Sequence, residues 1–325
     1  MKAVLCKEFG PVENLVIENV APLKAGPGQV VISVKACGIN FPDGLIVQGK
    51  YQTKPPLPFS PGLEVSGVIR EVGEGATGVK VGQRVIAFPG VGGLAEELVV
   101  DAGLTFPMPD SMDFASAAGF IITYATSHHA LKQRGNLKPG ETLLVLGAAG
   151  GVGLTAVEIG KVMGARVIAA ASSDDKLALC KQYGADEVIN YATENLRERI
   201  KALTGGKGVD VVYDPVGGEL AEAAVRSLAW MGRFLVIGFA AGEIPKIPLN
   251  LLLLKSSSLV GVYWGAALKA DPKAGREGVA ELLSWYDQGK LKPYISATYP
   301  LDRAAEAIEQ VTGRQTKGKV VVVME

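Results

Sequence analysis

One stretch of the sequence constrains the fold more than any other. Residues 143–153 place a short apolar run directly before closely spaced glycines and a helical segment. Glycine adopts positive φ without strain and lets backbone N–H groups approach a pyrophosphate, and the N-terminus of a helix adds partial positive charge. A plain strand-to-helix connection would use the same residues, so the turn by itself is a weak signal.

Behind this turn, strand-like runs alternate with helical segments. The predicted strands are 165–171, 187–189, 209–213 and 233–238, and the predicted helices are 152–163, 174–183, 195–203 and 220–230. This alternation predicts parallel strand pairing and a doubly wound sheet. In that context the turn predicts a dinucleotide-binding site. Its phosphate-binding segment is Ala149, Gly150, Gly151, Val152 and Gly153.

The sequence up to about residue 115 has a different character. Short strand-like runs such as 28–35 and 63–72 are separated by Gly and Pro, which predicts an irregular, barrel-like β domain. A last strand at 319–324 follows the α/β segment and suggests that the chain returns to that domain. The predicted fold class is therefore α/β, with a barrel-like β domain plus a doubly wound parallel sheet.

The second predicted strand of the α/β segment indicates which dinucleotide is used. An enzyme that prefers NAD carries an acidic residue about 20 positions beyond the turn, where it binds the ribose 2′-hydroxyl, but Ala171 stands there. Ser172, Ser173 and Lys176 follow, and hydroxyls with a lysine suit a 2′-phosphate. The aspartates at 174–175 are interpreted as helix-capping residues. NADPH is the predicted cofactor.

Composition and charge exclude several classes of protein. Lys+Arg and Asp+Glu both number 33, so the formal net charge is zero, and the basic excess typical of a nucleic-acid binder is missing. The three cysteines, Cys6, Cys37 and Cys180, form no CxxC pair, which fits a reducing compartment. Residues 2–5 already read as a strand, and the apolar stretch 249–268 is broken by Asn, Lys and Ser. We expect no signal peptide, no membrane span and a cytoplasmic location.

Two N-terminal segments resemble the metal-binding segments of medium-chain alcohol dehydrogenases. They are residues 36–43 and 60–64, and in those enzymes a zinc-ligating cysteine and histidine stand where Asn40 and Leu63 stand here. Leucine cannot coordinate zinc and asparagine is a poor ligand for it. The adjacent residues 128–129, both histidine, would face different directions on a helix and are interpreted as polar or capping residues. No metal is predicted.

Several separated segments resemble the zinc-free quinone oxidoreductase branch of the medium-chain dehydrogenase/reductase superfamily, which includes the zeta-crystallin type. The matching segments are 38–41, 150–153, 188–191 and 211–214, with 226–230, 251–255 and 263–265 similar to the quinone oxidoreductase-like subgroup. The resemblance implies a GroES-like catalytic domain, 1–122 and 262–325, and an NADPH-binding Rossmann domain, 123–261. It also implies a homodimer joined edge to edge through the Rossmann sheets.

The resemblance also implies roles for individual residues. Lys176 and Tyr191 match positions at the 2′-phosphate, Asn40 matches one near the nicotinamide ribose, and Thr123 matches one beside the nicotinamide. Gly238 and Phe239 match a segment that runs past the nicotinamide. Asn40, Tyr51 and Thr123 are the candidate catalytic residues. Tyr51 matches a tyrosine of the substrate cleft, where its hydroxyl would bind a developing oxyanion, although packing of its ring against a loop explains it equally well.

The expected activity is hydride transfer from NADPH to a quinone or a conjugated enone, without zinc. Without a Lewis acid a simple ketone is harder to polarise, whereas quinones and enones accept hydride more readily. Two alternatives stay open. The first is a reductase of the same fold that acts on an enoyl thioester, and the second is a non-catalytic NADPH-binding protein.

Overall fold

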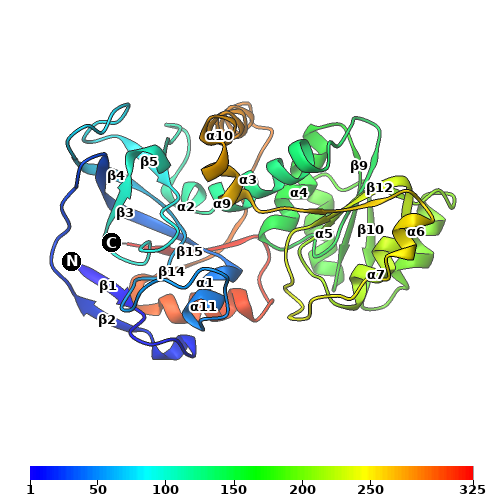
Figure 1. The fold of residues 1–325 in the computed structure, drawn as a ribbon, viewed down its shortest axis with the longest axis horizontal. Coiled ribbons are helices and arrows are strands. Elements are labelled where there is room, and N and C mark those ends of the chain that lie inside the picture. Colours follow the sequence, from blue (N-terminus) through cyan, green and yellow to red (C-terminus); the bar gives the residue numbers. More distant parts are fainter. Residues whose placement is uncertain (325) are drawn as a thin grey trace. The chain divides into compact units, whose positions relative to one another are not determined.

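The chain forms two compact units, each of which is described here by itself. The computed structural model describes residues 1–324. The first unit consists of Met1–Ile122 and Pro293–Glu325, and the second of Thr123–Lys292. In the colours of Figure 1, the first unit combines the blue and cyan start of the chain with its red end, and the second is mainly green and yellow. The predicted domain boundary at 261/262 stays a prediction.

The first unit is built on a mixed β-sheet. Its strand order is β14 (Ile295–Pro300), β15 (Lys319–Val323), β3 (Gln29–Ile39), β4 (Glu64–Val72), β5 (Arg84–Ala87) and β7 (Thr105–Pro107), with β6 (Glu97–Asp101) beside β3. A separate antiparallel pair consists of β1 (Lys2–Leu5) and β2 (Val16–Asn19). Because the order ends at β14 and β7, no closed barrel is formed within residues 1–324.

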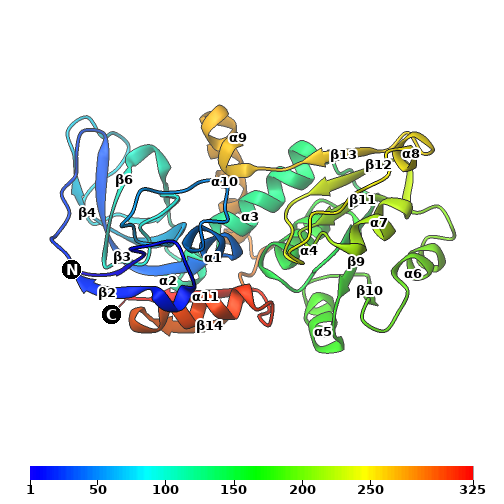
Figure 2. The same ribbon diagram turned by 60° about the horizontal axis from the view of Figure 1, so that its bottom comes forward.

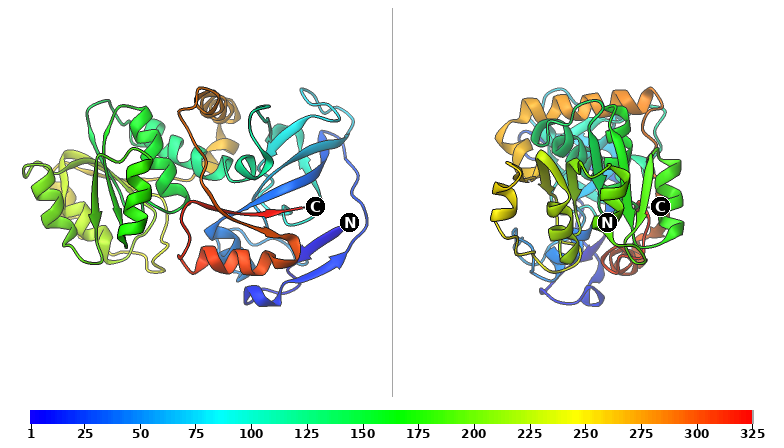
Figure 3. Two further views of the ribbon diagram at one scale, coloured as in Figure 1. Left: turned by 180° about the vertical axis from the view of Figure 1, so that it is seen from behind. Right: turned by 90° about the vertical axis from the view of Figure 1, so that its right-hand side faces the viewer.

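Short helices complete the first unit. They are α1 (Phe41–Val47), α2 (Phe114–Ala118) and α11 (Ala304–Thr312), with 3₁₀ turns at Val12–Asn14, Ala102–Leu104 and Leu301–Arg303. The predicted return of the chain is confirmed, since β15 pairs antiparallel with β3 at Val320 and Ile39. Figure 3 shows this red strand beside the blue one. The valine side chains of β15 are buried at 320–322, which explains the continuous apolar run.

The second unit is a doubly wound α/β domain, as predicted. Its six strands are all parallel, in the order β10 (Glu187–Asn190), β9 (Arg166–Ala171), β8 (Thr142–Val145), β11 (Val209–Asp214), β12 (Leu228–Val236) and β13 (Ser258–Gly261). In chain order this is 3-2-1-4-5-6, the strand order of Rossmann dinucleotide-binding domains.

Helices pack against this sheet (Figure 2). They are α4 (Gly151–Val162), α5 (Asp174–Gln182), α6 (Leu196–Leu203) and α7 (Glu219–Arg226), and the unit also contains α8 (Asn250–Leu253), α9 (Trp264–Ala270) and α10 (Pro272–Asp287). Helix α3 (Ile121–His128) begins at the unit boundary and continues into a π-helical turn at His129–Arg134. Within residues 1–324, no helix has both the length and the apolar character needed to span a membrane.

Candidate cofactor and catalytic site

The glycine-rich turn lies between β8 and α4, at the centre of the parallel sheet. Gly147 has a φ of 55°, a conformation that glycine adopts readily. A Cβ on Gly153 would lie 2.2 Å from the carbonyl oxygen of Gly147, so glycine is required for the helix to approach the turn this closely. Gly150 caps α4 without a side-chain hydrogen bond. The first-turn N–H groups of α4 have no preceding intrahelical acceptor and suit a phosphate.

The candidate 2′-phosphate residues follow the carboxyl ends of β9 and β10. Ala171 and Asn190 are register partners in these neighbouring strands, and the backbone N–H of Tyr191 donates to the carbonyl of Ala171 at 3.1 Å. The ammonium of Lys176 donates to the hydroxyl of Ser172 at 3.4 Å. The structure therefore brings a lysine and a hydroxyl together beyond an alanine where an NAD-specific enzyme has a carboxylate.

The structure supports only part of the capping interpretation of residues 174–175, since they complement the helix dipole without capping the helix. Both aspartates lie in the first turn of α5, where negative charge is favourable. Asp174 accepts a hydrogen bond from Asn190 at 2.8 Å and Asp175 accepts one from Ser173. Ser173 is thus bonded to a carboxylate and stands at the N-cap of α5 without capping it by its side chain.

The segment with Gly238 and Phe239 follows β12 at the same edge of the sheet. The backbone N–H of Gly238 donates to the carbonyl of Asp214, at the end of β11, at 3.3 Å. The Asp214 carboxylate accepts hydrogen bonds from the N–H groups of Val216 and Gly217 at 2.7 and 3.0 Å. Burial raises the pKa of Asp214. Its role is to shape the turn beside β12, and Phe239 stays partly exposed, at 37%.

In the first unit, strand register gathers three polar residues at one end of the sheet. Glu64 begins β4 opposite Gly38 of β3, while Lys319 begins β15 next to Val320, which lies opposite Ile39. Asn40 directly follows β3. A Cβ on Gly38 would lie 2.1 Å from the carbonyl oxygen of Ala118 and 2.7 Å from Glu64 Oε1. Glycine at 38 therefore leaves room for the Glu64 carboxylate.

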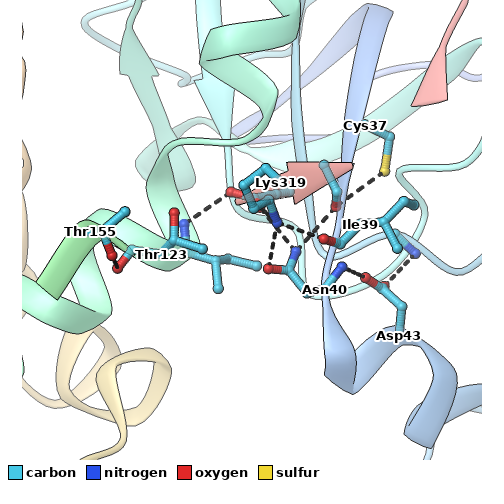
Figure 4. A network of polar contacts seen from close by, with 11 residues as sticks. Cys37, Ile39, Asn40, Asp43, Thr123, Thr155 and Lys319 are labelled. Atoms are coloured by element: carbon cyan, nitrogen blue, oxygen red, sulfur yellow. Dashed lines mark hydrogen bonds and ion pairs between the residues drawn. The ribbon is translucent and has the colours of Figure 1, made fainter. Parts of the chain in front are cut away.

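These residues form a buried ion pair with a shared amide (Figure 4). Lys319 Nζ lies 2.8 Å from Glu64 Oε1, and the two side chains are 6% and 0% exposed. The ammonium also donates to Asn40 Oδ1 at 2.8 Å and to the carbonyl of Ile39 at 2.6 Å. All three N–H bonds of the lysine are thus used.

The same network fixes which way the Asn40 amide points. Its Nδ2 donates to Glu64 Oε1 at 2.9 Å and to the carbonyl of Gly38 at 3.1 Å, and both partners are acceptors only. Its Oδ1 faces Lys319, which is a donor only. The N–H bonds of the amide are therefore fully used, and its oxygen is held by the Lys319 ammonium.

A second buried carboxylate, Asp43, holds the turn around Asn40. It accepts from the backbone N–H of Asn40 at 2.8 Å and from that of Gly62 at 3.1 Å. Asn40 and Asp43 form the capping box of α1. Burial raises the pKa of Asp43 to about 7, against these N–H donors and the nearby Lys319 ammonium, which lower it.

Thr123 lies one residue after a backbone amide that is bonded to the same glutamate. Glu64 Oε2 accepts from the N–H of Ile122 at 2.9 Å, in the first turn of α3, where helices need an acceptor. Thr123 is buried at 2% exposure, and its carbonyl accepts from the hydroxyl of Thr155 at 3.1 Å. Asn40 and the start of α3 are therefore held by one carboxylate.

Tyr51 lies in a loop of the first unit and is partly buried against the core of that unit. This contact agrees with the packing interpretation of its ring. The contact does not test the role of the Tyr51 hydroxyl, which stays a prediction.

The residues present do not fit a catalytic zinc ion at the resembling position. Leu63 is 8% exposed and belongs to the hydrophobic core. Asn40 Oδ1 is bonded to an ammonium, and a cation beside that oxygen repels a metal ion. In the part of the chain that the structure describes, no group of three or more His, Cys, Asp or Glu residues is arranged to hold a metal.

The adjacent histidines have separate partners, as expected for helix residues that face different directions. His128 is buried, and its Nε2 lies 2.8 Å from Glu281 on α10. Burial lowers the pKa of His128, against the effect of Glu281, which raises it. His129 is bonded to Gln133.

Three members of the buried network, Asp43, Glu64 and Lys319, were not among the predicted site residues. Asp43 and Glu64 lay inside the segments that carried the resemblance, but no role was inferred for them. The available signal was charge in apolar surroundings, because Lys319 begins an otherwise all-valine strand and Glu64 follows a core leucine. A charge in such a place is buried and needs a partner.

The fold and the turn define the class of protein, a Rossmann-type dinucleotide-binding domain combined with a β domain. Residues 26–110 match the alcohol dehydrogenase GroES-like domain family, and residues 151–285 match the zinc-binding dehydrogenase family. A relative from Nematostella vectensis, quinone oxidoreductase-like protein 2 homolog, is 44% identical over 99% of this chain and 88% of its own length. Quinone oxidoreductase-like protein 2 of Bos taurus is 40% identical over 100% of this chain and 93% of its own.

A similar solved structure is that of Escherichia coli quinone oxidoreductase complexed with NADPH. It has a TM-score of 0.94, 30% sequence identity, and coverage of 99% of this chain and 100% of that one. The chain belongs to the quinone oxidoreductase-like group of the medium-chain dehydrogenase/reductase superfamily and is an oxidoreductase of that superfamily.

Proposed function

We propose that this chain is an NADPH-dependent oxidoreductase that transfers hydride to a quinone or a conjugated enone without a metal ion. The observation that carries the proposal is the Asn40 amide oxygen bonded to Lys319, at a position where related alcohol dehydrogenases carry a zinc ligand. Similar proteins support it, since the Escherichia coli structure contains NADPH and a second NADPH complex, of mycobacterial Rv1454c, has a TM-score of 0.93 at 32% identity.

Three features of the second unit support the proposed binding of NADPH. The turn before α4 offers backbone N–H groups to the pyrophosphate. Because Gly153 packs closely against Gly147, the N-terminus of α4 lies close to this turn. Lys176 and Ser172 offer a cation and a hydroxyl to the 2′-phosphate. When bound, the cofactor supplies the hydride.

The absence of fitting metal ligands favours acceptors that are already electron-poor. A metal ion lowers the barrier for a simple carbonyl by several kcal/mol by polarising its oxygen. Quinones and enones need less help because their reduced forms delocalise the negative charge. Tyr51 is the candidate donor to the developing oxyanion, and Tyr51→Phe is expected to lower kcat/KM by more than about tenfold, as for loss of a positioned donor. Unchanged kcat/KM would leave only the packing role.

The decisive experiment compares NADPH and NADH oxidation with 9,10-phenanthrenequinone, 1,4-benzoquinone, an enone, a simple ketone and crotonyl-CoA. We expect faster turnover with NADPH, activity with quinone or enone, and no effect of a zinc chelator. Turnover of crotonyl-CoA alone would favour a thioester reductase, and the structure of CurK enoyl reductase is indeed similar, with a TM-score of 0.91 at 28% identity. Tight NADPH binding without any turnover would favour a non-catalytic protein.

We also propose that the protein is a cytoplasmic homodimer joined through the edge of the parallel sheet. Strand β13 ends that sheet, and an edge strand offers unpaired backbone groups. Large apolar side chains are exposed near it, with Leu253 at 79%, Leu254 at 67% and Trp230 at 68% exposure. A patch of this kind is typical of a protein–protein interface.

A further inference from the structure

We propose that Lys319 is a positioning residue. Its ammonium orients the Asn40 side chain and, through Glu64, holds the N-terminus of α3. The inference rests on the proposed function, because Asn40 and Thr123 are the residues assigned to the nicotinamide side of NADPH. Lys319 touches neither cofactor nor substrate in this proposal. It acts through the two side chains to which it is bonded.

The charge of the lysine makes the buried carboxylate possible. Glu64 is fully buried, and a carboxylate in such a place needs a charged partner and hydrogen-bond donors. The Lys319 ammonium, 2.8 Å from Glu64 Oε1, is that charged partner. An ionised Glu64 is an acceptor at both oxygens, so it accepts the N–H groups of Asn40 and of Ile122.

The same ammonium gives the Asn40 amide a single orientation. With Lys319 as a pure donor and Glu64 as a pure acceptor, a flipped amide would face donor to donor and acceptor to acceptor. If Lys319 were replaced by an apolar residue, the Asn40 oxygen would lose its ammonium donor. The amide would then be held through its nitrogen alone, and its position would be less well defined.

One carboxylate therefore links two segments that are far apart in sequence. Glu64 binds the Asn40 side chain through Oε1 and the Ile122 amide, one residue before Thr123, through Oε2. Lys319 comes from the last strand, 279 residues beyond Asn40. The C-terminal return of the chain thus supplies the cation that fixes both segments.

The kinetic test compares Lys319→Met, Lys319→Arg and the charge-neutral double variant Lys319→Met/Glu64→Gln. For a positioning role we expect kcat with a quinone to fall at least about tenfold in Lys319→Met, while the Kd for NADPH changes less than about threefold. The deuterium isotope effect on kcat should rise with NADPH labelled at the transferred position. Lys319→Arg should recover part of kcat, and the exposed Lys35→Met serves as the matched control.

The double variant separates positioning from simple charge neutralisation. It leaves no unpaired buried charge, so its thermal stability should return towards that of the natural chain, which also covers the case in which Lys319→Met fails to fold. Its kcat should stay low, because methionine cannot hold the amide oxygen. Recovery of full kcat in the double variant, or full kcat in Lys319→Met, would overturn the proposal.

A measurement that does not depend on activity tests the role of Lys319 even if the proposed reaction is wrong. In protein labelled with ¹⁵N-asparagine, the side-chain amide signals of Asn40 are assigned by their loss in Asn40→Gln. We expect them to exchange slowly with solvent in the natural chain and to shift and exchange faster in Lys319→Met. Unchanged signals would overturn the role of Lys319. A natural chain that oxidises no NADPH but shows these changes would overturn the proposed function alone.

Discussion

At the residue scale, the predicted choice of NADPH rests on a missing carboxylate as much as on a lysine. Ala171 ends β9 where an acidic side chain would repel a 2′-phosphate, and Lys176 lies one turn into the following helix beside Ser172. These residues are close in sequence, so the chain alone was enough to predict their proximity. Whether they bind the 2′-phosphate stays a prediction.

Lys176→Ala is expected to raise the KM for NADPH by roughly 10–100-fold. The reason is the loss of one charge-assisted hydrogen bond, which contributes about 1.5–3 kcal/mol. The KM for NADH should change little, since NADH has no 2′-phosphate. Steady-state kinetics with both cofactors measure the effect, and Lys181→Ala, exposed on the same helix, is the matched control. An equal change for both cofactors would place Lys176 away from the 2′-phosphate.

At the scale of elements, the N-terminus of α3 and the N-terminus of α4 are held by different means. Helix α3 takes Glu64 as the acceptor for its first turn. Helix α4 begins without a side-chain cap and is held close to the turn by glycine instead. The difference agrees with the proposed phosphate site, because a capping side chain at Gly150 would compete with a phosphate for the same N–H groups.

Gly153→Ala is expected to weaken NADPH binding by at least about tenfold and to destabilise the second unit by about 1–3 kcal/mol, a typical cost of overpacking. The added Cβ would lie 2.2 Å from a backbone oxygen, so α4 must move away from the turn. Gly238→Ala is the stability control, because its Cβ would meet nothing closer than 3.4 Å. Titration with NADPH and chemical unfolding provide the two readouts. Normal affinity and stability in Gly153→Ala would contradict the close approach.

A buried carboxylate on α4 makes the stability of the second unit depend on pH. Glu158 accepts from the hydroxyl of Tyr124 at 2.6 Å and from the backbone N–H of Lys292 at 2.8 Å. Burial raises its pKa from 4.5 to about 7, although these donors lower it. The folded chain therefore binds more protons than the unfolded chain between these values. This stabilisation is fully present below about pH 4.5 and is lost as pH rises through about 7.

Glu158→Gln is expected to remove most of this dependence. The free energy of unfolding of the variant minus that of the natural chain should rise by about 3 kcal/mol between pH 4.5 and pH 8. This is the free-energy equivalent of raising one pKa from 4.5 to about 7. All three tryptophans, Trp230, Trp264 and Trp285, lie in the second unit, so their fluorescence reports its unfolding. A stability difference that does not vary with pH would show that Glu158 has an ordinary pKa.

At the scale of the whole molecule, the edge of the parallel sheet exposes large apolar side chains that no other part of the described chain covers. Leu253→Glu/Leu254→Glu is expected to convert the proposed dimer to a monomer, because two charges would be buried in the interface. Sedimentation velocity measures the change. Val81→Glu, at an apolar residue of 62% exposure in the first unit, is the control. A natural chain that sediments as a monomer would contradict the proposal.

The sequence by itself determined the features that depend on neighbours along the chain. These are the parallel βα units, the glycine-rich turn, the alanine and lysine after the second strand, and the acidic first turn of α5. Each is encoded in a few consecutive residues, where hydrophobic period and turn chemistry act locally. The return of the last strand was also anticipated, from a single apolar run after the α/β segment.

Only the tertiary structure decided how the buried polar network around Asn40 is built. Asn40 was recognised from its motif, but its orientation depends on Glu64 and on Lys319, which approach through strand pairing from 24 and 279 residues away. Local sequence patterns carry no information about which strands pair at such separations, because pairing is chosen by the packing of the whole sheet. A buried lysine signals that a partner exists, and the fold alone identifies which carboxylate it is.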